Sequence, residues 1–333
     1  MKTLTRLLLT ICLLALSSTL LHATDPAQEF SIAKNPNGLW SYGSTTTLGG
    51  TFTLYPQALV NVQGVQGKDL WNVGNTDCNA GQTPILGRST EQQTQPPAFI
   101  IFPVDTLDMH PGCHGEDTVL RWTAPLSGNY RLRGSFEGID ECCPTTDVHI
   151  RLNSMTSVLD ADINGFGQVA LFDVKRAVSA GDTIDFIVGF GSDGNYFNDS
   201  TALQLAIDLL PTIDIKPGDA GNTIHIGTLG SVGVAILSST SFNAPAMVVK
   251  GSLTFGRIGD EQSLVLRPDH SDPRLLVPVC STLDVNGDGL KDLVCQFNKQ
   301  VAGFQLTDTS GVVRGKTGTG VTIKGTDSVK IVQ

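Results

Sequence analysis

The sequence has little positive charge and few charged residues of either sign. It has 22 Lys and Arg against 32 Asp and Glu, a formal net charge of −10, and 16% charged residues. Nucleic acids and anionic membrane surfaces are bound through basic patches, so this balance argues against both as partners. The chain holds 36 Gly and 16 Pro, and long stretches rich in Glu, Lys and Ala are missing, so the composition favours a β protein over a helical one.

Enzyme signatures are also missing. The chain contains no H-E-x-x-H motif, no G-x-S-x-G motif and no nucleophile–base pattern. Carboxylates are plentiful, but a glycosidase needs two of them facing each other across a cleft, and spacing along the chain does not reveal such a pair. We therefore expect a non-catalytic protein and rank a glycan-active hydrolase lowest among its functions.

The first 23 residues have the pattern of a secretory signal peptide. Lys2 and Arg6 give a basic start, residues 7–16 form an apolar run, and Ala23 precedes the expected cleavage point. The run is too short for a permanent membrane span, and no later segment is long and apolar enough for one. Loss of the two basic residues would change the formal charge from −10 to −12. We expect no membrane insertion and a secreted product, extracellular or at the cell surface, with the periplasm as an alternative.

Alternation of apolar and polar residues with a period of two predicts strands through the rest of the chain. It is clear in YRLRGSF (130–136), DVHIRL (147–152), TIDFIVGF (183–190) and ALQLAIDLL (202–210). The second half, after Pro211, shows the same alternation between Pro-Gly and Gly-Asn turns. The sequence therefore predicts an all-β fold with two jelly-roll-like β-sandwich domains in tandem after the signal peptide, at 24–210 and 211–333.

Cysteine usage predicts disulfides. An even number in an exported chain implies bridges, and six remain after the expected cleavage. Cys280 and Cys295 flank one loop and are expected to bond to each other. Three pairings are open for the remaining four, and Cys142 and Cys143 are expected to bond to different partners because a bond between neighbours is strained. The six are Cys78, Cys113, Cys142, Cys143, Cys280 and Cys295.

The stretch DVNGDGLKDL, residues 284–293, has the spacing of a calcium loop. Calcium takes six to eight oxygen ligands, and a D-x-N-x-D-G pattern wraps side chains and one carbonyl around a single ion. Position twelve is Cys295 and not Glu, so the loop leads into a strand, and we expect a structural Ca²⁺ and not a switch. An acidic hairpin turn is the alternative. The predicted ligands are Asp284, Asn286, Asp288, the carbonyl of Leu290, and Asp292.

Aromatic residues make up only 6% of the chain, so their positions are informative. Several stand beside turns and near Asn or Asp, an arrangement with which sandwich proteins stack on sugar rings and bind the hydroxyls. The alternative, favoured for each residue taken separately, is that they close the ends of the sandwich. Trp122 is predicted to be in the core. The candidate ligand-binding residues are Trp40, Tyr42, Trp71, Tyr196, Asn198 and Asp199.

The first half resembles a known family. Taken in order, FSIAKNPNGLWSYG, VLRWTAPLSGNYRLRGSFEGID, TTDVHIRLN and AGDTIDFIVGFG are similar to a jelly-roll domain of exported proteins from environmental bacteria, often of the PEP-CTERM type. The resemblance spans about residues 29–209, and the sorting tail of that type is absent from this chain. It implies a galactose-binding-like fold, as in carbohydrate-binding modules, and hence a glycan or another surface polymer as partner.

The second half, about residues 212–333, resembles a C-terminal β domain of bacterial secreted and cell-surface proteins. That domain carries a D-x-N-G-D-G stretch of the FG-GAP or dockerin kind, which implies Ca²⁺ at residues 284–292 and an accessory role. The combined expectation is a secreted, calcium-stabilised, non-catalytic binding protein. The alternative is a structural or adhesive component of an extracellular matrix or surface assembly, which associates with itself or with other surface proteins.

Overall fold

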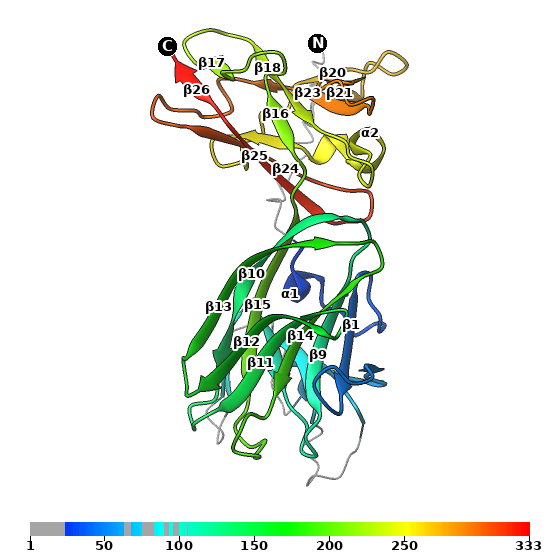
Figure 1. Cartoon of the computed structure of the whole chain (residues 1–333), viewed down its shortest axis with the longest axis vertical. Helices are drawn as coiled ribbons and strands as arrows, with labels where there is room; N and C mark the ends of the chain where they lie inside the picture. The colour runs from blue at the N-terminus through cyan, green and yellow to red at the C-terminus, as the bar shows by residue number, and fades with distance from the viewer. Residues whose placement is uncertain (1–23, 63–67, 75–82, 90–92, 96–99, 105) are drawn as a thin grey trace, which may run out of the picture.

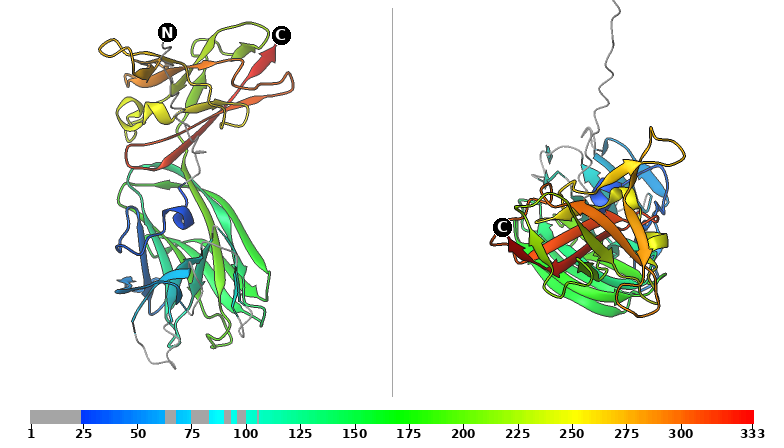
Figure 2. Two further views of the ribbon diagram at one scale, coloured as in Figure 1. Left: turned by 180° about the vertical axis from the view of Figure 1, so that it is seen from behind. Right: turned by 90° about the horizontal axis from the view of Figure 1, so that it is seen from above.

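The computed structural model describes residues 24–62, 68–74, 83–89, 93–95, 100–104 and 106–333. The expected signal peptide, residues 1–23, and Cys78 lie outside the described residues. The described chain forms two lobes joined at a narrow waist, and the two views with the long axis vertical show this division (Figure 1 and Figure 2, left). The fold is all-β, as predicted. Within the described residues, no helix has the length and apolar character needed to cross a membrane.

The lower lobe is a sandwich of two sheets, and the six-stranded sheet lies in front in Figure 1. Its strand order is β12-β11-β14-β9-β1-β2, and every pairing is antiparallel. The strands are β1 (Trp40–Thr45), β2 (Thr53–Leu54), β9 (Asp117–Thr123), β11 (Thr145–Leu152), β12 (Thr156–Asn164) and β14 (Thr183–Gly189).

The opposing sheet has ten strands and continues into the upper lobe, in the order β19-β24-β25-β15-β8-β5-β4-β3, with β10 on β15 and β13 on β10. Its lower-lobe strands are β3 (Gln57–Leu59), β4 (Lys68–Asn72), β5 (Ile85–Ser89), β8 (Leu107–His110), β10 (Gly128–Gly138), β13 (Val169–Val178) and β15 (Thr201–Leu209). Helix α1 (Pro26–Glu29) and the ribbon β6 (Gln93–Gln95) with β7 (Ile100–Phe102) complete this lobe.

The upper lobe supplies β19 (Thr254–Gly256), β24 (Ser310–Lys316) and β25 (Thr322–Ser328) to the large sheet. A four-stranded sheet packs beside them, with β16 (Ile213–Ile215), β18 (Ser231–Ile236), β23 (Asp292–Asn298) and β22 (Cys280–Leu283) in that order. Two ribbons pair β17 (Thr223–His225) with β26 (Lys330–Val332) and β20 (Leu266–Pro268) with β21 (Leu276–Pro278), and helix α2 (Ala244–Met247) precedes a 3-10 turn at Lys250–Ser252.

The predicted alternation decides which side chains fill the lower lobe. Val148 and Ile150 on β11 are buried against the opposite sheet, whereas the residues between them face away from it. Trp122 is fully buried, as predicted, and its ring meets that of Tyr130 edge-on with centroids 5.0 Å apart. Each large aromatic of this kind contributes roughly 150–250 Å² of buried surface, so these residues dominate the core.

The lobes meet where β15 pairs with β25 in parallel, at Leu209 and Ile323. Thr24 reinforces the junction and is only 1% exposed. Its backbone exchanges hydrogen bonds with Ile207 (3.1 and 2.9 Å), and its N–H and hydroxyl contact Thr322 of the upper lobe. One backbone segment therefore ties the two lobes together beside the connection at residues 210–212.

The structure contains the predicted Cys280–Cys295 bridge, which links directly opposed residues of β22 and β23. Cys113 is also disulfide-bonded. The expectation for Cys142 and Cys143 is corrected, because both are exposed free thiols. Their neighbouring side chains contact each other, which raises the pKa of Cys142. The other described cysteines are already bonded, so no second partner is left for either thiol within that part of the chain.

Candidate functional site

Three of the predicted ligand-binding aromatics are core residues. Trp40 and Tyr42 are 0% exposed and Trp71 is 7% exposed. The indole of Trp40 donates to Glu29 (2.8 Å), that of Trp71 donates to the carbonyl of Ser31 (2.8 Å), and Tyr42 stacks on Trp71. These three residues cannot contact a ligand at the surface, so their assignment to a ligand site is wrong, and they pack in the core instead.

The other three candidates lie in the loop before β15 and differ in their exposure. Asp199 is 0% exposed and accepts from the N–H of Thr145 (2.9 Å), while Asn198 adopts a left-handed turn conformation with φ of 67°. Tyr196 is half-buried and packs against Phe197, with ring centroids 4.4 Å apart. Phe197, which the sequence analysis did not select, is 58% exposed. This loop therefore offers one small aromatic pair and not the six-residue site that was predicted.

The loop that the sequence predicts to bind calcium lies at the surface between β22 and β23. Asp284 accepts from the N–H groups of Gly287 (2.8 Å) and Gly289 (3.0 Å), and Asp288 accepts from that of Leu290 (2.8 Å). These bonds gather the side-chain oxygens on one turn, and each oxygen keeps a lone pair that an ion could use. The side chains so gathered are those of Asp284, Asn286 and Asp288.

Asp292 differs from the prediction. It is 0% exposed, and its two oxygens accept from the N–H groups of Ser238 (2.8 Å) and Val285 (3.0 Å). Asp292 therefore fixes the base of the loop from below instead of reaching an ion directly. Across the described residues, no group of three or more His, Cys, Asp and Glu side chains is arranged to hold a metal ion. The loop fits calcium only through its exposed turn.

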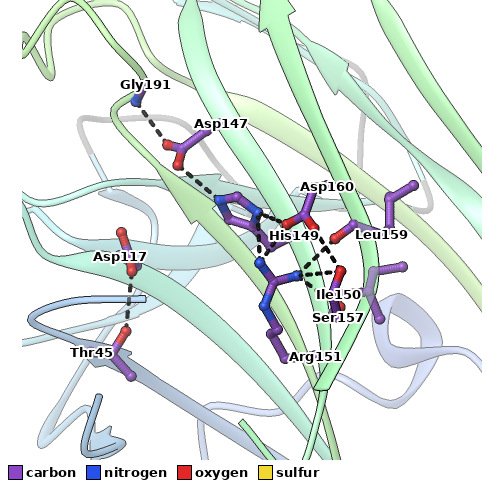
Figure 3. Close-up of polar contacts among 10 residues, drawn as sticks. All are labelled: Thr45, Asp117, Asp147, His149, Ile150, Arg151, Ser157, Leu159, Asp160 and Gly191. Atoms are coloured by element: carbon purple, nitrogen blue, oxygen red, sulfur yellow. Dashed lines mark hydrogen bonds and ion pairs between the residues drawn. The ribbon is translucent and has the colours of Figure 1, made fainter. Parts of the chain in front are cut away.

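A larger polar cluster covers the face of the six-stranded sheet that points away from the core (Figure 3). The residues of β11 that alternate with Val148 and Ile150 project onto this face. The ring of His149 lies between two carboxylates, with Nε2 2.8 Å from Asp147 Oδ2 and Nδ1 2.6 Å from Asp160 Oδ1. Asp160 comes from β12, directly opposite His149 in the register.

Arg151 supports the cluster from the same strand. Its guanidinium pairs with Asp160 and donates to the carbonyl of Leu159 (3.0 Å) and the hydroxyl of Ser157 (3.3 Å). The Arg151 side chain is 9% exposed, whereas that of Asp160 is 50% exposed. A buried cation thus holds an accessible carboxylate in one position (Figure 3).

A glycine separates two carboxylates on the neighbouring strands. Gly189 on β14 lies opposite Asp147, and a Cβ placed on it would come within 2.4 Å of Asp147 Oδ1 and 2.8 Å of Asp117 Oδ1. The two oxygens are therefore no farther apart than the sum of these distances. Asp147 is held by the N–H of Gly191 (2.8 Å), and Asp117 accepts from the hydroxyl of Thr45 (3.3 Å). The absence of a side chain at Gly189 lets the two carboxylates approach each other over its backbone.

The same face carries a second fixed ion pair. Arg121 on β9 and Asp185 on β14 are cross-strand partners and form a two-pronged bond at 2.7 and 2.8 Å. Ser154 accepts from Arg121 (2.8 Å) and donates to Asp185 (3.0 Å), and the Phe52 ring lies 4.1 Å from the guanidinium carbon. Two-pronged Arg–carboxylate pairs hold their geometry well, so this part of the face is also rigid.

These contacts move the pKa values of the acids in opposite directions. The bond from His149 lowers the pKa of Asp147, whereas burial, with the nearby charge of Asp147, raises the pKa of Asp117 to about 6. Burial alone would lower the pKa of His149, but its bonds to the two carboxylates outweigh this and raise it. Against the opposing effect of burial, the bonds from Ser157, Arg151 and His149 lower the pKa of Asp160 to about 2.

The cluster therefore presents fixed hydrogen-bond acceptors beside a cationic ring on a solvent-facing sheet. Hydroxyl groups are donors and acceptors at once, and a rigid set of partners binds them without first paying ordering entropy. The sequence analysis missed this cluster, although its signal is present in the alternating D-x-H-x-R of residues 147–151. The partners on β9, β12 and β14 depend on strand register and are not visible in the local sequence.

No family model matches this chain, and no curated protein matches it. Solved structures similar to it include a CBM51 module from Clostridium perfringens GH95 in complex with methyl-galactose, at 13% identity, a TM-score of 0.26, and coverage of 46% of this chain and 94% of that one. Another is a family 35 carbohydrate-binding module from Clostridium thermocellum, at 12% identity, a TM-score of 0.21, and coverage of 45% and 97%. The adhesin domain of Epf from Streptococcus pyogenes has 11% identity, a TM-score of 0.27, and coverage of 90% and 99%. Scores this low do not bear on what this chain binds.

Proposed function

We propose that this chain is an exported, non-catalytic binding protein whose lower lobe holds a glycan, or another hydroxyl-rich surface polymer, on the face of the six-stranded sheet. The observation that carries this proposal is the set of carboxylates fixed on this face, where His149 and Arg151 hold the partly exposed side chains of Asp147 and Asp160. A sugar hydroxyl that met this face would find carboxylate acceptors already in place.

Each part of the cluster has a role in this proposal. Asp147 and Asp160 accept hydrogen bonds from sugar hydroxyls, because their bonds to cationic partners keep them ionised. His149 uses both ring nitrogens on these carboxylates and so fixes the orientation of both acceptors. The aromatic pair Tyr196–Phe197 lies in the loop that follows β14 and offers a face on which a sugar ring could stack.

The test is a glycan array followed by calorimetry with a neutral oligosaccharide that binds. Asp147→Asn should weaken binding at least tenfold, because it removes a charged acceptor and the fixed His149 contact. Asp173→Asn is the matched control, since Asp173 also pairs with an arginine but lies on the opposite sheet. Equal affinity in both variants would refute the site, and release of shorter sugars by the wild-type protein would favour the hydrolase that was ranked lowest.

A second candidate function is adhesion through self-association. Phe166, Val169 and Leu171, at the end of the outer strand β13 and in the turn before it, are 49%, 44% and 78% exposed. Exposed apolar side chains that lie together are typical of contact surfaces between proteins. Light scattering over a range of concentrations tests this function, and Leu171→Lys should abolish any dimer. A monomer at all concentrations would remove this candidate.

We also propose that the turn at Asp284, Asn286 and Asp288 holds a structural Ca²⁺. The support is the gathering of three oxygen-bearing side chains on one exposed turn, with the Cys280–Cys295 bridge closing its base. Calcium would supply a positive charge that draws these oxygens together and stiffens the loop. The loop lies in the upper lobe, so its role is stability and not contact with the sugar.

A further inference from the structure

A group of cations lies on the outer face of the large sheet, across the waist between the lobes. On β10 and β13, Arg131 lies directly opposite Lys175. On β24 and β25, Arg314 lies directly opposite Lys324. Like charges that face each other across neighbouring strands repel and destabilise the sheet. Two such pairs in a chain with a formal net charge of −10 need a physical reason.

The carboxylates nearby pair with the arginines of this group and not with its two lysines. Asp173 pairs with Arg131, and Asp208 pairs with Arg133 at 3.2 Å. Lys175 and Lys324 take part in no ion pair with any described residue, although the chain has acids to spare. Buried Nε–H groups remain without a hydrogen-bond acceptor on Arg133 and on Arg314, whose closest carboxylate oxygen, on Asp260, is 3.4 Å away.

Three of these cations, Arg131, Lys175 and Lys324, line a cavity of about 290 Å³. Arg131 and Lys175 line it from the lower lobe, Lys324 and Thr326 line it from β25, and Thr212 lies on the connection between the lobes. Burial, reinforced by the neighbouring arginines, lowers the pKa of Lys324, and the charge of Asp208 opposes this only in part. The cavity therefore combines positive charge, hydroxyl groups and walls from both lobes.

We propose that this cavity binds an oxyanion of an acidic polysaccharide. That oxyanion is either a sulfate ester or a carboxylate. Lysine and arginine donate strong charge-assisted bonds to such groups, and Arg131, Lys175 and Lys324 present such donors to the cavity. A cavity of this volume admits one acidic sugar unit and not a folded partner. Because both lobes contribute to the walls, the anion would bridge them and stiffen the waist.

This site is separate from the polar cluster around His149 and does not depend on the proposed function. The cluster presents carboxylates on the six-stranded sheet, whereas the cavity presents cations on the ten-stranded sheet. A polysaccharide with both free hydroxyls and acidic groups could engage both. Failure of one site in a binding experiment leaves the other to be judged by itself.

The first experiment uses inorganic sulfate and the intact chain. Thermal unfolding is compared in sodium sulfate and sodium chloride at equal ionic strength, for the wild type and for Lys175→Gln with Lys324→Gln. Sulfate should raise the Tm of the wild type much more than that of the double variant, and the dissociation constant should rise at least tenfold in the variant. The matched control is Lys250→Gln with Lys330→Gln, two exposed lysines outside the cavity, which should respond as the wild type does.

A second readout needs no ligand. Because the repulsion of facing cations is removed, the double variant should unfold at a higher temperature than the wild type when no multivalent anion is present. Titration with sulfated, uronate and neutral oligosaccharides then distinguishes a sulfate ester from a carboxylate as the group bound. An equal response to sulfate in wild type and double variant, or a double variant that is less stable without anions, would overturn the proposal.

Discussion

The two lobes satisfy their surface carboxylates in different ways. In the lower lobe, Asp147 and Asp160 are held by the side chains of His149 and Arg151, on strands paired by the sheet. In the upper lobe, Asp284 and Asp288 are held by N–H groups two to five residues farther along the same loop. The first arrangement depends on register and charge and the second on local backbone shape, so the two should fail under different perturbations.

The largest expected difference is in the response to pH. Burial raises the pKa of Asp199 to about 7 and that of Asp117 to about 6, both in the lower lobe. The folded lobe therefore holds these protons more tightly than the unfolded chain, and its stability falls as the pH rises from about 4 through 7. Urea unfolding should show the wild type about 2–4 kcal/mol more stable at pH 5 than at pH 8.

Asp199→Asn and Asp117→Asn identify the source of this dependence. An amide cannot ionise and keeps an oxygen that can accept from Thr145 or Thr45. Each variant should be more stable than the wild type at pH 8 and should flatten the profile, with the larger effect at Asp199. A profile unchanged by both substitutions would contradict the assignment.

Asp292→Ala should have the next largest effect, in the upper lobe. The substitution leaves the N–H groups of Ser238 and Val285 without their acceptor, and a lost hydrogen bond to a charged group costs about 1.5 kcal/mol or more. We expect a loss of about 2–3 kcal/mol by chemical denaturation, nearly the same at pH 5 and pH 8. Asp288→Ala, at an exposed position of the same loop, is the control and should cost much less.

Arg151→Met sharpens the comparison within the lower lobe. Methionine keeps most of the buried stem but leaves Asp160 without the Arg151 guanidinium, so we expect a loss of about 1–2 kcal/mol. Arg131→Met removes a similar pair with Asp173, but Arg131 is more open to solvent than Arg151, so it should cost much less. Equal losses would show that the burial of Arg151 does not matter.

The smallest expected effect is that of calcium on the upper lobe. At a concentration ten times its dissociation constant, Ca²⁺ should stabilise the wild type by about 1.4 kcal/mol. Asp288→Asn should abolish this gain, whereas Asp292→Asn should retain it, because Asp292 supports the loop from below. Melting curves with calcium and with chelator measure the difference, and a wild type indifferent to both would exclude the ion.

The same contrast explains how much the sequence could predict. The strands and the Cys280–Cys295 bridge follow from alternation and spacing along the chain, which the structure confirms. The turn at 284–290 is a local motif, so the residues that gather there were identifiable. Whether an aromatic side chain is covered depends on residues far away in the sequence. For this reason the sequence analysis placed Trp40, Tyr42 and Trp71 at the surface, whereas the structure buries them.

The polar cluster around His149 and the cavity between the lobes depend on pairings between strands that are distant in the sequence. His149 and Asp160 lie on the two strands of one hairpin. Asp117 and Asp147 lie close together because β14 pairs with both of their strands. Arg131 lies near the upper lobe because its strand pairs with β15, which pairs with β25. No spacing rule connects these positions. Their joint chemistry appears only when register is fixed.

The hydrogen bonds of Thr24 with both lobes have a practical consequence for the design of shorter fragments. A fragment that stopped at residue 210 would lose Thr322, which Thr24 contacts, and would bare the edge of β15 where β25 adds to it. Uncovered strand edges recruit other chains, so such a fragment should precipitate unless that edge is blocked. Structural work should therefore keep both lobes and the connection between them in one chain.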